Sequence, residues 1–234
     1  MAGTPVLQTA VKTVELLEVL ARQGAEAVSL ARIAEQVGWG RAATHQYLNS
    51  LVHAGWVEQD AERRYRLGGA AFVFAQSVGQ HAGAPRAVVA MMEELVDALN
   101  EPISFAILHR DEALIVERRE PQRSLIYRNL ERHLDLTTAS GQVLLAFDDR
   151  TRAYWRPEYT LLAEEVRKKG YGEIRNQEWM GDAVEAFAVP IMNGEQCLGA
   201  LSVIAPVGRM PVDRAIAELF AARKKAEANI AGSG

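Results

Sequence analysis

The sequence predicts an α+β protein with a helical first half and a second half in which helices flank an antiparallel sheet. Its 234 residues exceed what one typical domain needs and suit two. Apolar residues recur mainly at helical spacing in the first half, whereas short strands joined by polar turns alternate with helices in the second. Glycine and proline cluster in His-Ala-Gly-Ala-Pro at residues 81–85, where we place the boundary.

Charge is divided unevenly between the halves. The formal net charge is −4, yet residues 1–83 contain seven basic and seven acidic side chains, so the acidic excess falls entirely in residues 84–234. If the first half binds DNA, one copy should bind weakly, because affinity grows with the number of phosphates neutralised. We therefore expect a dimer that presents two copies.

Cysteine content and hydropathy indicate the compartment. The lone cysteine, Cys197, excludes an intramolecular disulfide framework and a cysteine-rich zinc site. The first twenty residues lack the charged start and long apolar run of a signal peptide, and no run of about 18 apolar residues could span a membrane. We expect a cytoplasmic protein with no membrane partner, no metal and no other cofactor.

Residues 29–51 predict two short helices joined by a tight turn. Ser29 can cap the first helix by accepting from free backbone N–H groups, and Gly38-Trp39-Gly40 supplies the turn. The second helix, residues 41–52, has an inner face of Ala43, Tyr47, Leu48 and Leu51. Its outer face carries Arg41, Thr44, His45, Gln46 and Asn49. These donors and acceptors, with no acid among them, suit a helix in the DNA major groove. The alternative is a helical hairpin in another all-α core.

The flanking segments complete a winged helix-turn-helix. A first helix is predicted at residues 8–22, with a buried stripe of Val11, Val14, Leu17 and Leu20. Residues 55–67 predict a β-hairpin that carries Arg63, Arg64 and Arg66. These arginines are placed where a wing would meet the phosphate backbone. Alternatively, they only solvate the edge of a hairpin.

Residues 67–80 are apolar and predict a helix that connects the two halves. We therefore assign a first domain to residues 1–68, a linker helix to 69–84 and a second domain to 85–234. In the second domain we expect helices at residues 86–100, 140–147, 161–169 and 211–229. We expect strands at residues 103–109, 113–119, 124–128, 185–191 and 197–204.

Segments along nearly the whole chain resemble the IclR-type bacterial transcription regulators. In the first half these are TVELLEVLARQG, SLARIAEQVGWGRAATHQYLNSLVHAGWVEQD and RRYRLG. In the second half they are SFAILHRDEALIVERRE, TTASGQVLLAF, KKGYGEI and EAFAVPIMNGEQCLGALSVIAP. The resemblance implies a winged helix-turn-helix, a linker helix and a GAF-like effector-binding domain. It also implies homodimers or dimers of dimers on double-stranded promoter DNA, and a small organic metabolite as effector.

The recognition helix departs from the pattern of this family. Such helices commonly begin with proline, a basic residue, serine and threonine, whereas this one begins Gly40-Arg41-Ala42-Ala43. Two hydroxyls are thus missing, and more of the readout falls to Arg41, His45 and Gln46. The predicted DNA-binding residues are Ser29, Arg41, Ala42, Ala43, Thr44, His45, Gln46, Asn49, Arg63, Arg64 and Arg66.

The resemblance also implies an effector site in the second domain. The ligand loop falls on Ala139, Ser140 and Gly141, where a helix N-terminus could face an anion. The usual pair of pocket serines falls on Ser202 and Ile204, and a cysteine common on the opposite strand falls on Ala186. Lid residues fall on Asn176, Glu178, Trp179 and Met180. Fewer polar groups suggest an organic acid with an apolar or aromatic body. The alternative is an ordinary helix start and core-filling side chains.

The sequence therefore indicates a ligand-responsive DNA-binding transcription regulator, which we expect to be a repressor. One alternative is a metabolite-binding protein whose degenerate helix-turn-helix no longer regulates DNA, since the first half is neutral and Ala42-Ala43 replaces two hydroxyls. A more distant alternative is an enzyme on a GAF-like domain. Cys197 alone cannot form a redox pair, no G-x-S-x-G motif is present, and the histidines lack metal-ligand spacing, so we expect no catalytic residue.

Overall fold

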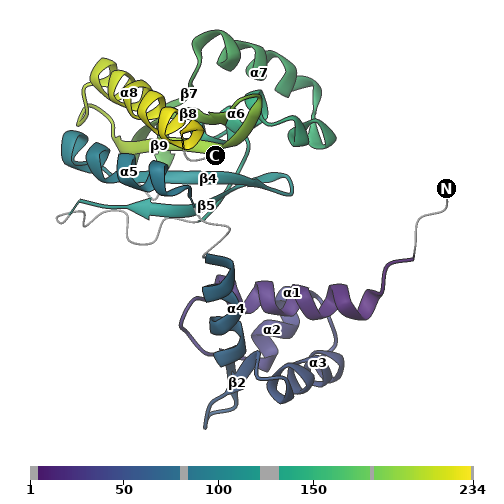
Figure 1. Cartoon of the computed structure of the whole chain (residues 1–234). Helices are drawn as coiled ribbons and strands as arrows, with labels where there is room; N and C mark the ends of the chain where they lie inside the picture. The colour runs from purple at the N-terminus through teal and green to yellow at the C-terminus, as the bar shows by residue number, and fades with distance from the viewer. Residues whose placement is uncertain (1–4, 80–83, 122–131, 180–181, 233–234) are drawn as a thin grey trace. The chain divides into compact units, whose positions relative to one another are not determined.

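The computed structural model describes residues 5–79, 84–121, 132–179 and 182–232. The chain divides into two compact units, residues 1–82 and 83–234. The predicted α+β class is confirmed, with short strands among the helices of the first unit and a large antiparallel sheet in the second (Figure 1).

The first unit is a winged helix-turn-helix. Its elements are α1 (Gln8–Arg22), β1 (Val28–Ser29), α2 (Leu30–Val37), α3 (Arg41–His53), β2 (Val57–Gln59), β3 (Arg64–Leu67) and α4 (Gly69–Gly79). The strands form a small antiparallel sheet in the order β1-β3-β2. The helices close over a core of Leu16, Leu20, Val28, Ile33, Leu48, Leu51, Val57 and Tyr65. This core fixes α2, α3 and the β2–β3 wing as one rigid group.

The boundaries of α1 match the prediction, and its buried stripe matches in part, because Leu20 is buried and Leu17 is half-buried as predicted. Leu16 and Leu20 are buried, whereas Val11 and Val14 are 39% and 48% exposed. The apolar residues of this helix occupy more than one face, so periodicity alone does not show which face packs. Contacts with α2, α3 and β3 decide in favour of Leu16 and Leu20.

A helix also occupies the predicted connector. α4 begins against the wing, where the N–H of Ala70 donates to the carbonyl oxygen of Gly55 at 3.0 Å. The rings of Trp56 and Phe74 lie 5.3 Å apart. These contacts join α4 to the first unit, while Phe72 remains 65% exposed in the single chain.

The second unit contains a six-stranded antiparallel sheet in the order β6-β5-β4-β9-β8-β7. Its strands are β4 (Ile103–His109), β5 (Glu112–Arg119), β6 (His133–Leu134), β7 (Gly172–Trp179), β8 (Asp182–Asn193) and β9 (Gln196–Pro206). Its helices are α5 (Arg86–Leu99), α6 (Ala139–Phe147), the 3-10 helix η1 (Asp149–Tyr154), α7 (Pro157–Lys169) and α8 (Val212–Ala231).

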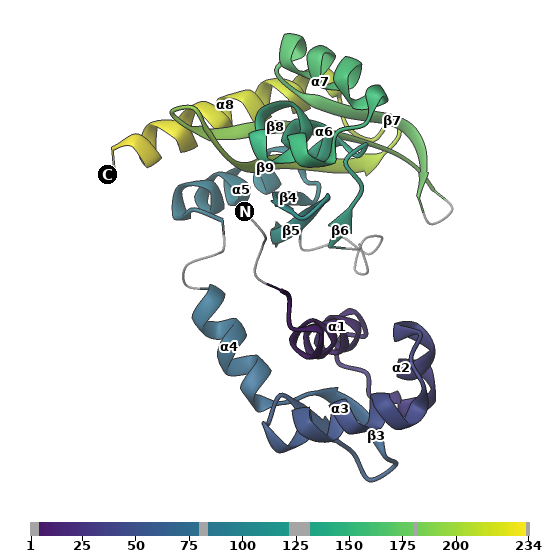
Figure 2. The same cartoon turned by 90° about the vertical axis from the view of Figure 1, so that its right-hand side faces the viewer.

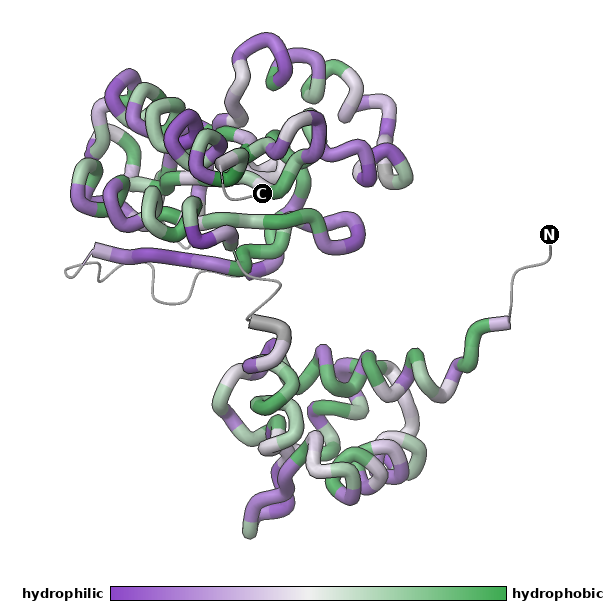
Figure 3. Tube along the Cα trace, viewed as in Figure 1, coloured by the Kyte–Doolittle hydropathy of each residue, from purple (hydrophilic) through white to green (hydrophobic). Residues whose placement is uncertain are grey.

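Helices cover both faces of this sheet. α5 and α8 pack side by side on one face, and α6 and α7 pack on the other (Figures 1 and 2). Each face has its own apolar core, and the central strands are accordingly hydrophobic, whereas the wing of the first unit is hydrophilic (Figure 3). The cavity described below lies between α6 and this sheet.

Most predicted elements of the second unit are present. β4 has the predicted bounds, and α5 ends at Asn100, which adopts a left-handed conformation (φ 55°) before Pro102 is reached. β7 was not predicted as a strand, and the predicted lid residues Asn176, Glu178 and Trp179 fall in its second half. The predicted strand at residues 124–128 lies outside the described residues. In the described part of the chain, no helix is long and apolar enough to cross a membrane.

Candidate functional site

The turn between α2 and α3 is held by its own backbone. Ser29 Oγ accepts a hydrogen bond from the N–H of Arg32 at 3.4 Å, which confirms the predicted N-cap. Gly38 ends α2 in the left-handed region (φ 69°), where a side chain would be strained. The N–H of Trp39 then donates to the carbonyl oxygen of Ala34 at 3.0 Å. These bonds fix the direction in which α3 begins.

α3 presents a polar outer face. As expected, Arg41, His45, Gln46 and Asn49 are exposed, and Ala42 is exposed as well. His45 Nδ1 and Asn49 Nδ2 lie 3.5 Å apart, one helical turn from each other. The helix therefore offers a donor and acceptor surface of the kind that contacts base edges.

The prediction that Thr44 lies on this outer face is wrong. Thr44 is fully buried, and its Oγ1 donates to the carbonyl oxygen of Gly40 at 3.2 Å. It precedes the buried Leu48 by four residues and so falls on the same helical stripe. Ala43, which we expected on the inner face, is exposed instead.

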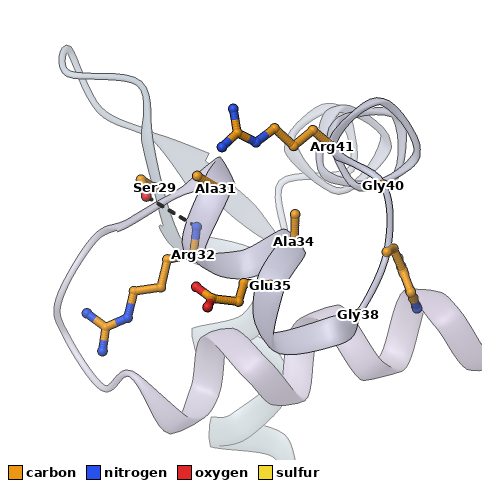
Figure 4. Close-up of a pocket in the computed structure, with 9 residues that line it drawn as sticks. Ser29, Ala31, Arg32, Ala34, Glu35, Gly38, Gly40 and Arg41 are labelled. Atoms are coloured by element: carbon orange, nitrogen blue, oxygen red, sulfur yellow. Dashed lines mark hydrogen bonds between the residues drawn. The ribbon is translucent and has the colours of Figure 1, made fainter.

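An open hollow of about 770 Å³ lies where α2 and α3 begin. It is lined by Ser29, Ala31, Arg32, Ala34, Glu35, Gly38, Trp39, Gly40 and Arg41. The Arg41 side chain extends from the start of α3 in the direction of the first turn of α2 (Figure 4). Within the described residues, neither Arg32 nor Arg41 has an ion-pair partner, so both positive charges face solvent. Arg32 was not among the predicted DNA-binding residues.

The wing arginines are largely neutralised within their own hairpin. Arg64 forms ion pairs with Asp60 at 2.8 Å and Glu62 at 3.3 Å. The backbone N–H of Arg64 also donates to the Asp60 carboxylate, and this bond is the main cause that lowers the pKa of Asp60. Arg66 lies 3.1 Å from Glu58, its partner in the strand register.

Arg63 differs from the other two wing arginines. It occupies the turn in a left-handed conformation (φ 62°), its side chain is exposed, and in the described part of the chain it has no ion-pair partner. The wing thus presents one uncommitted positive charge rather than three.

In the second unit, the start of α6 packs closely on the sheet. Thr138 Oγ1 accepts from the N–H of Gly141 at 3.2 Å and caps the helix. A Cβ on Gly141 would lie 2.4 Å from the carbonyl oxygen of Asp135, and one on Gly172 would lie 2.4 Å from that of Ala139. Glycine is therefore required at both positions for the helix to approach the neighbouring loop and β7.

A β-bulge in β5 decides which residues face α6. The pairing of β4 with β5 shifts between Phe105 and Ala106 and leaves Val116 as an extra residue. Side chains alternate between faces along a strand, so one extra residue reverses the alternation. Ile115 and Arg118 consequently line the same cavity, although they are three positions apart in the sequence.

Arg118 begins a row of small and polar residues that crosses the sheet. Its partner in β4 is Ser104, whose partner in β9 is Ser202, followed by Ala188 in β8. Arg118 Nε donates to Ser104 Oγ, and Ser202 Oγ donates to the carbonyl oxygen of Ser104, each at 3.3 Å. Both serines are buried. One cation and two hydroxyls therefore lie together under α6.

These residues border a cavity of about 40 Å³. Its lining consists of Ser104, Ile115, Arg118, Leu134, Thr138, Ala139, Ser140, Ile174, Ala186, Ser202, Val203 and Ile204. Five predicted effector-site residues are thus brought together from α6, β8 and β9: Ala139, Ser140, Ala186, Ser202 and Ile204. Ala186 and Ile204 are direct partners in the β8–β9 register.

The remaining predicted effector residues are not in this lining. The N–H of Gly141 is used by Thr138. Asn176 and Glu178 are exposed on β7, where Asn176 sits at a pairing irregularity with φ 54°. Trp179 ends β7, but its side chain, like all of Met180, lies outside the described residues.

Two family models match this chain. The IclR helix-turn-helix domain matches residues 9–61, and the C-terminal domain of the bacterial transcriptional regulator IclR matches residues 77–231. The chain belongs to the IclR family. It is accordingly a DNA-binding transcriptional regulator.

Individual relatives match most of the IclR-type chain. A probable transcriptional regulator, SauR, from Cupriavidus necator is 29% identical over 226 residues, which cover 88% of each protein. The structure of HmgR from Pseudomonas aeruginosa is 27% identical, with a TM-score of 0.70 and coverage of 95% of this chain and 99% of HmgR. An IclR homolog from Microbacterium hydrocarbonoxydans, solved with 4-hydroxybenzoate, is 18% identical, with a TM-score of 0.75 and coverage of 97% and 100%.

Sequence reasoning missed Arg118 and Ser104 in this IclR-family chain. The segment ALIVERRE alternates in a way that would place Glu117 and Arg119 on the face of Ile115, and only the bulge at Val116 reverses this. Two arginines after an apolar strand could have pointed to a buried cation. The register of that strand, however, cannot be predicted from its own residues.

The thiol of Cys197 is neither exposed nor activated. It is buried beneath α6 and α7, and its Sγ lies 3.7 Å from the carbonyl oxygen of Gly199. Burial raises the pKa of the thiol to about 12. In this IclR-type domain the side chain therefore behaves as a small apolar residue.

Proposed function

We propose that this regulator is a ligand-responsive repressor that binds promoter DNA as a homodimer or a dimer of dimers. The observation that carries the proposal is the presence, in one IclR-family chain, of an exposed polar recognition helix and of a partly enclosed, partly polar cavity in a separate unit. It is a binding protein with no catalytic role.

DNA binding rests on α3 and on the hollow beside it. Gln46 and Arg41 are side chains that can read adenine and guanine by paired hydrogen bonds in the major groove. Arg32, near the capped start of α2, is suited to a phosphate contact, which positions the protein without reading sequence. The few uncommitted positive charges in one unit support a requirement for two copies on a palindrome-like site.

Effector binding rests on the cavity under α6. An arginine and two serines among apolar side chains suit a small organic acid whose apolar part contacts Ile174, Ala186 and Ile204. The 4-hydroxybenzoate bound by the Microbacterium homolog is itself an organic acid. We propose the same broad ligand class here.

The effector acts by population shift. Binding in the second unit favours an arrangement of the dimer in which the two recognition helices no longer match one operator. The change in operator affinity cannot exceed the difference in effector affinity between the two arrangements. α4, which contacts the wing through Trp56 and Phe74, is the element through which we expect this coupling to pass.

The experiment is a titration of fluorescent DNA fragments from the region upstream of the gene, at several salt concentrations. We expect tight binding to one fragment, a steep decrease with salt, and release by a small organic acid. Equal affinity for all fragments at every salt concentration would contradict the proposal.

A second candidate function is a metabolite-binding protein that no longer regulates DNA. Two observations favour it: Glu58, Asp60 and Glu62 neutralise Arg64 and Arg66, and Ala42 replaces a hydroxyl at the start of α3. Arg41→Ala and Gln46→Ala separate the candidates. Unchanged DNA binding in both variants would favour this second function, and a large loss in either one favours the repressor.

A further inference from the structure

Arg63 lies at the tip of the wing in a backbone conformation that favours glycine. Its φ of 62° is in the left-handed region, which costs free energy for a residue with a Cβ and which glycine or asparagine adopts more readily. Within the described residues, no ion pair of the Arg63 side chain offsets this cost. An arginine at such a position indicates a role for its side chain outside the isolated chain.

Hydrogen bonds of the turn hold the backbone of Arg63 in place. Its N–H donates to the carbonyl oxygen of Asp60 at 3.0 Å, and Gln59 Nε2 donates to the carbonyl oxygen of Arg63 at 3.4 Å. The N–H of Asp60 in turn donates to the carbonyl oxygen of Arg64 at 2.9 Å. The backbone around Arg63 is thus engaged within the hairpin, and its exposed side chain is what the tip offers to a partner.

The carboxylates of the wing are engaged with the other two arginines. Arg64 pairs with two of them, and Arg66 pairs with the third, Glu58. Each carboxylate lies within 3.3 Å of a guanidinium nitrogen, so its repulsion of DNA is reduced. The positive charge that the wing presents is therefore one side chain, Arg63, rather than a basic patch.

The wing projects on the same side of the first unit as α3, away from α1 (Figures 1 and 2). Tyr65 of β3 is buried in one core with Leu48 and Leu51 of α3. The N–H of Trp56 donates to the carbonyl oxygen of Leu51 at 3.0 Å, which fixes where the chain leaves the helix for β2. Because a minor groove borders every major groove, a wing fixed beside α3 meets the adjacent minor groove when α3 occupies the major groove.

The minor groove suits one arginine side chain better than a whole strand. It is about 6 Å wide, roughly half the width of the major groove. A·T-rich segments narrow it further and strengthen its negative potential, which attracts a guanidinium group. Their base edges also lack the amino group that a G·C pair places in this groove. A lone arginine at the wing tip therefore favours A·T pairs.

We propose that the Arg63 side chain enters the minor groove beside the base pairs read by α3, and that it selects A·T-rich sequence there through groove width and potential. Arg64 and Arg66 stay paired with the acids of the wing. The operator is then read in two ways, by hydrogen bonds from α3 to base edges and by groove shape at the wing tip. This inference rests on the DNA contact of α3 in the proposed function, but not on the repressor role or on an effector.

Selection of full-length protein on a library of duplexes with randomised sequence supplies the DNA for the test. The selected duplex is then remade with the pairs that flank its core as A·T, G·C or inosine·cytosine. An inosine·cytosine pair keeps the major-groove edge of G·C at O6 and N7 but lacks the amino group in the minor groove. It therefore separates minor-groove from major-groove readout. Fluorescence anisotropy measures the affinity for each of the three duplexes.

Three variants accompany the wild-type protein. Arg63→Gly removes the side chain and suits the left-handed backbone, so we expect it to fold. Arg63→Lys keeps the charge on a more strongly hydrated group. Arg66→Gln is the matched control, because it removes the same charge from the same wing. Melting curves verify that each variant is folded.

We expect the wild-type protein and Arg66→Gln to bind the A·T and inosine·cytosine duplexes about three- to tenfold more tightly than the G·C duplex. Arg63→Gly should bind all three duplexes with affinities within about twofold of one another, since the groove-reading side chain is gone. Arg63→Lys should be intermediate, because an ammonium group gives up its water less readily than a guanidinium group does.

The proposal is overturned if Arg63→Gly keeps the full preference for A·T flanks, if the inosine·cytosine duplex binds like the G·C duplex, or if Arg66→Gln loses the preference as Arg63→Gly does. A wild-type protein that binds its selected core but ignores the flanks overturns this proposal alone. A wild-type protein that selects no sequence overturns both this proposal and the proposed function.

Discussion

The Arg66 guanidinium lies 3.1 Å from the carboxylate of Glu58, directly opposite it in the wing hairpin. Both side chains are about half exposed, so the pair adds little to stability. Its larger effect concerns DNA, because a phosphate must compete with Glu58 for the same guanidinium. The positive charge of Arg66 is therefore available to DNA only when its ion pair with Glu58 is broken.

Glu58→Gln should release this charge. We expect operator affinity to rise about two- to tenfold at low salt. The slope of log affinity against log salt should steepen by about one, since one more phosphate is neutralised. Fluorescence anisotropy across a salt series measures both quantities. Glu15→Gln, at an exposed position of α1, makes the same charge change outside the wing and α3. Equal gains in both variants would show that net charge, not the Glu58–Arg66 pair, limits binding.

Arg32 and Arg41 line one hollow but should have different roles. Arg32→Gln should weaken binding to operator and unrelated DNA alike, by about three- to tenfold, and reduce the salt slope by about one, as loss of a phosphate contact does. Arg41→Gln should cost about 1–3 kcal/mol on the operator and much less on unrelated DNA, as loss of a base contact does. Arg22→Gln, at the end of α1, is the control. Identical profiles for Arg32→Gln and Arg41→Gln would contradict this division of roles.

The local signals in the sequence were sufficient for most elements. Ser29, Gly38 and the polar turn of the wing each act on their own neighbours, so the helix-turn-helix and hairpin could be read directly. Ala139, Ser202 and Ala186, which the resemblance to known regulators assigns to an effector site, line one cavity.

Features that depend on packing could not be read in this way. Thr44 looks like a polar surface residue, but its position relative to Leu48 buries it and directs its hydroxyl to Gly40. Arg118 reaches the cavity only because Val116 is bulged out of the ladder with β4. Both results depend on contacts between segments, and neither residue type reveals them.

Gly141→Ala should destabilise the second unit. The added Cβ would lie 2.4 Å from both the carbonyl oxygen of Asp135 and the Cα of Leu136, so α6 or the loop before it must move. We expect a loss of about 1–3 kcal/mol, as for overpacking. Gly69→Ala at the start of α4 meets no atom within 4 Å and should be neutral or stabilising by up to about 1 kcal/mol. Denaturant unfolding measures both variants. A stable Gly141→Ala protein with an unchanged cavity would contradict the close packing of α6.

Cys197 should be inert in the folded protein. With a pKa of about 12, less than about one molecule in a thousand carries the thiolate at pH 8.5, and only the thiolate reacts. Iodoacetamide at this pH should label the folded protein slowly and the protein unfolded in guanidinium chloride rapidly, as mass spectrometry can follow. The same shift has a stability consequence with a definite sign. Between about pH 9 and 12 the unfolded chain loses the thiol proton while the folded chain keeps it, so this group's contribution to stability falls as pH rises. Cys197→Ala should remove that part of the pH dependence, and equal labelling rates in folded and unfolded protein would contradict the buried, protonated thiol.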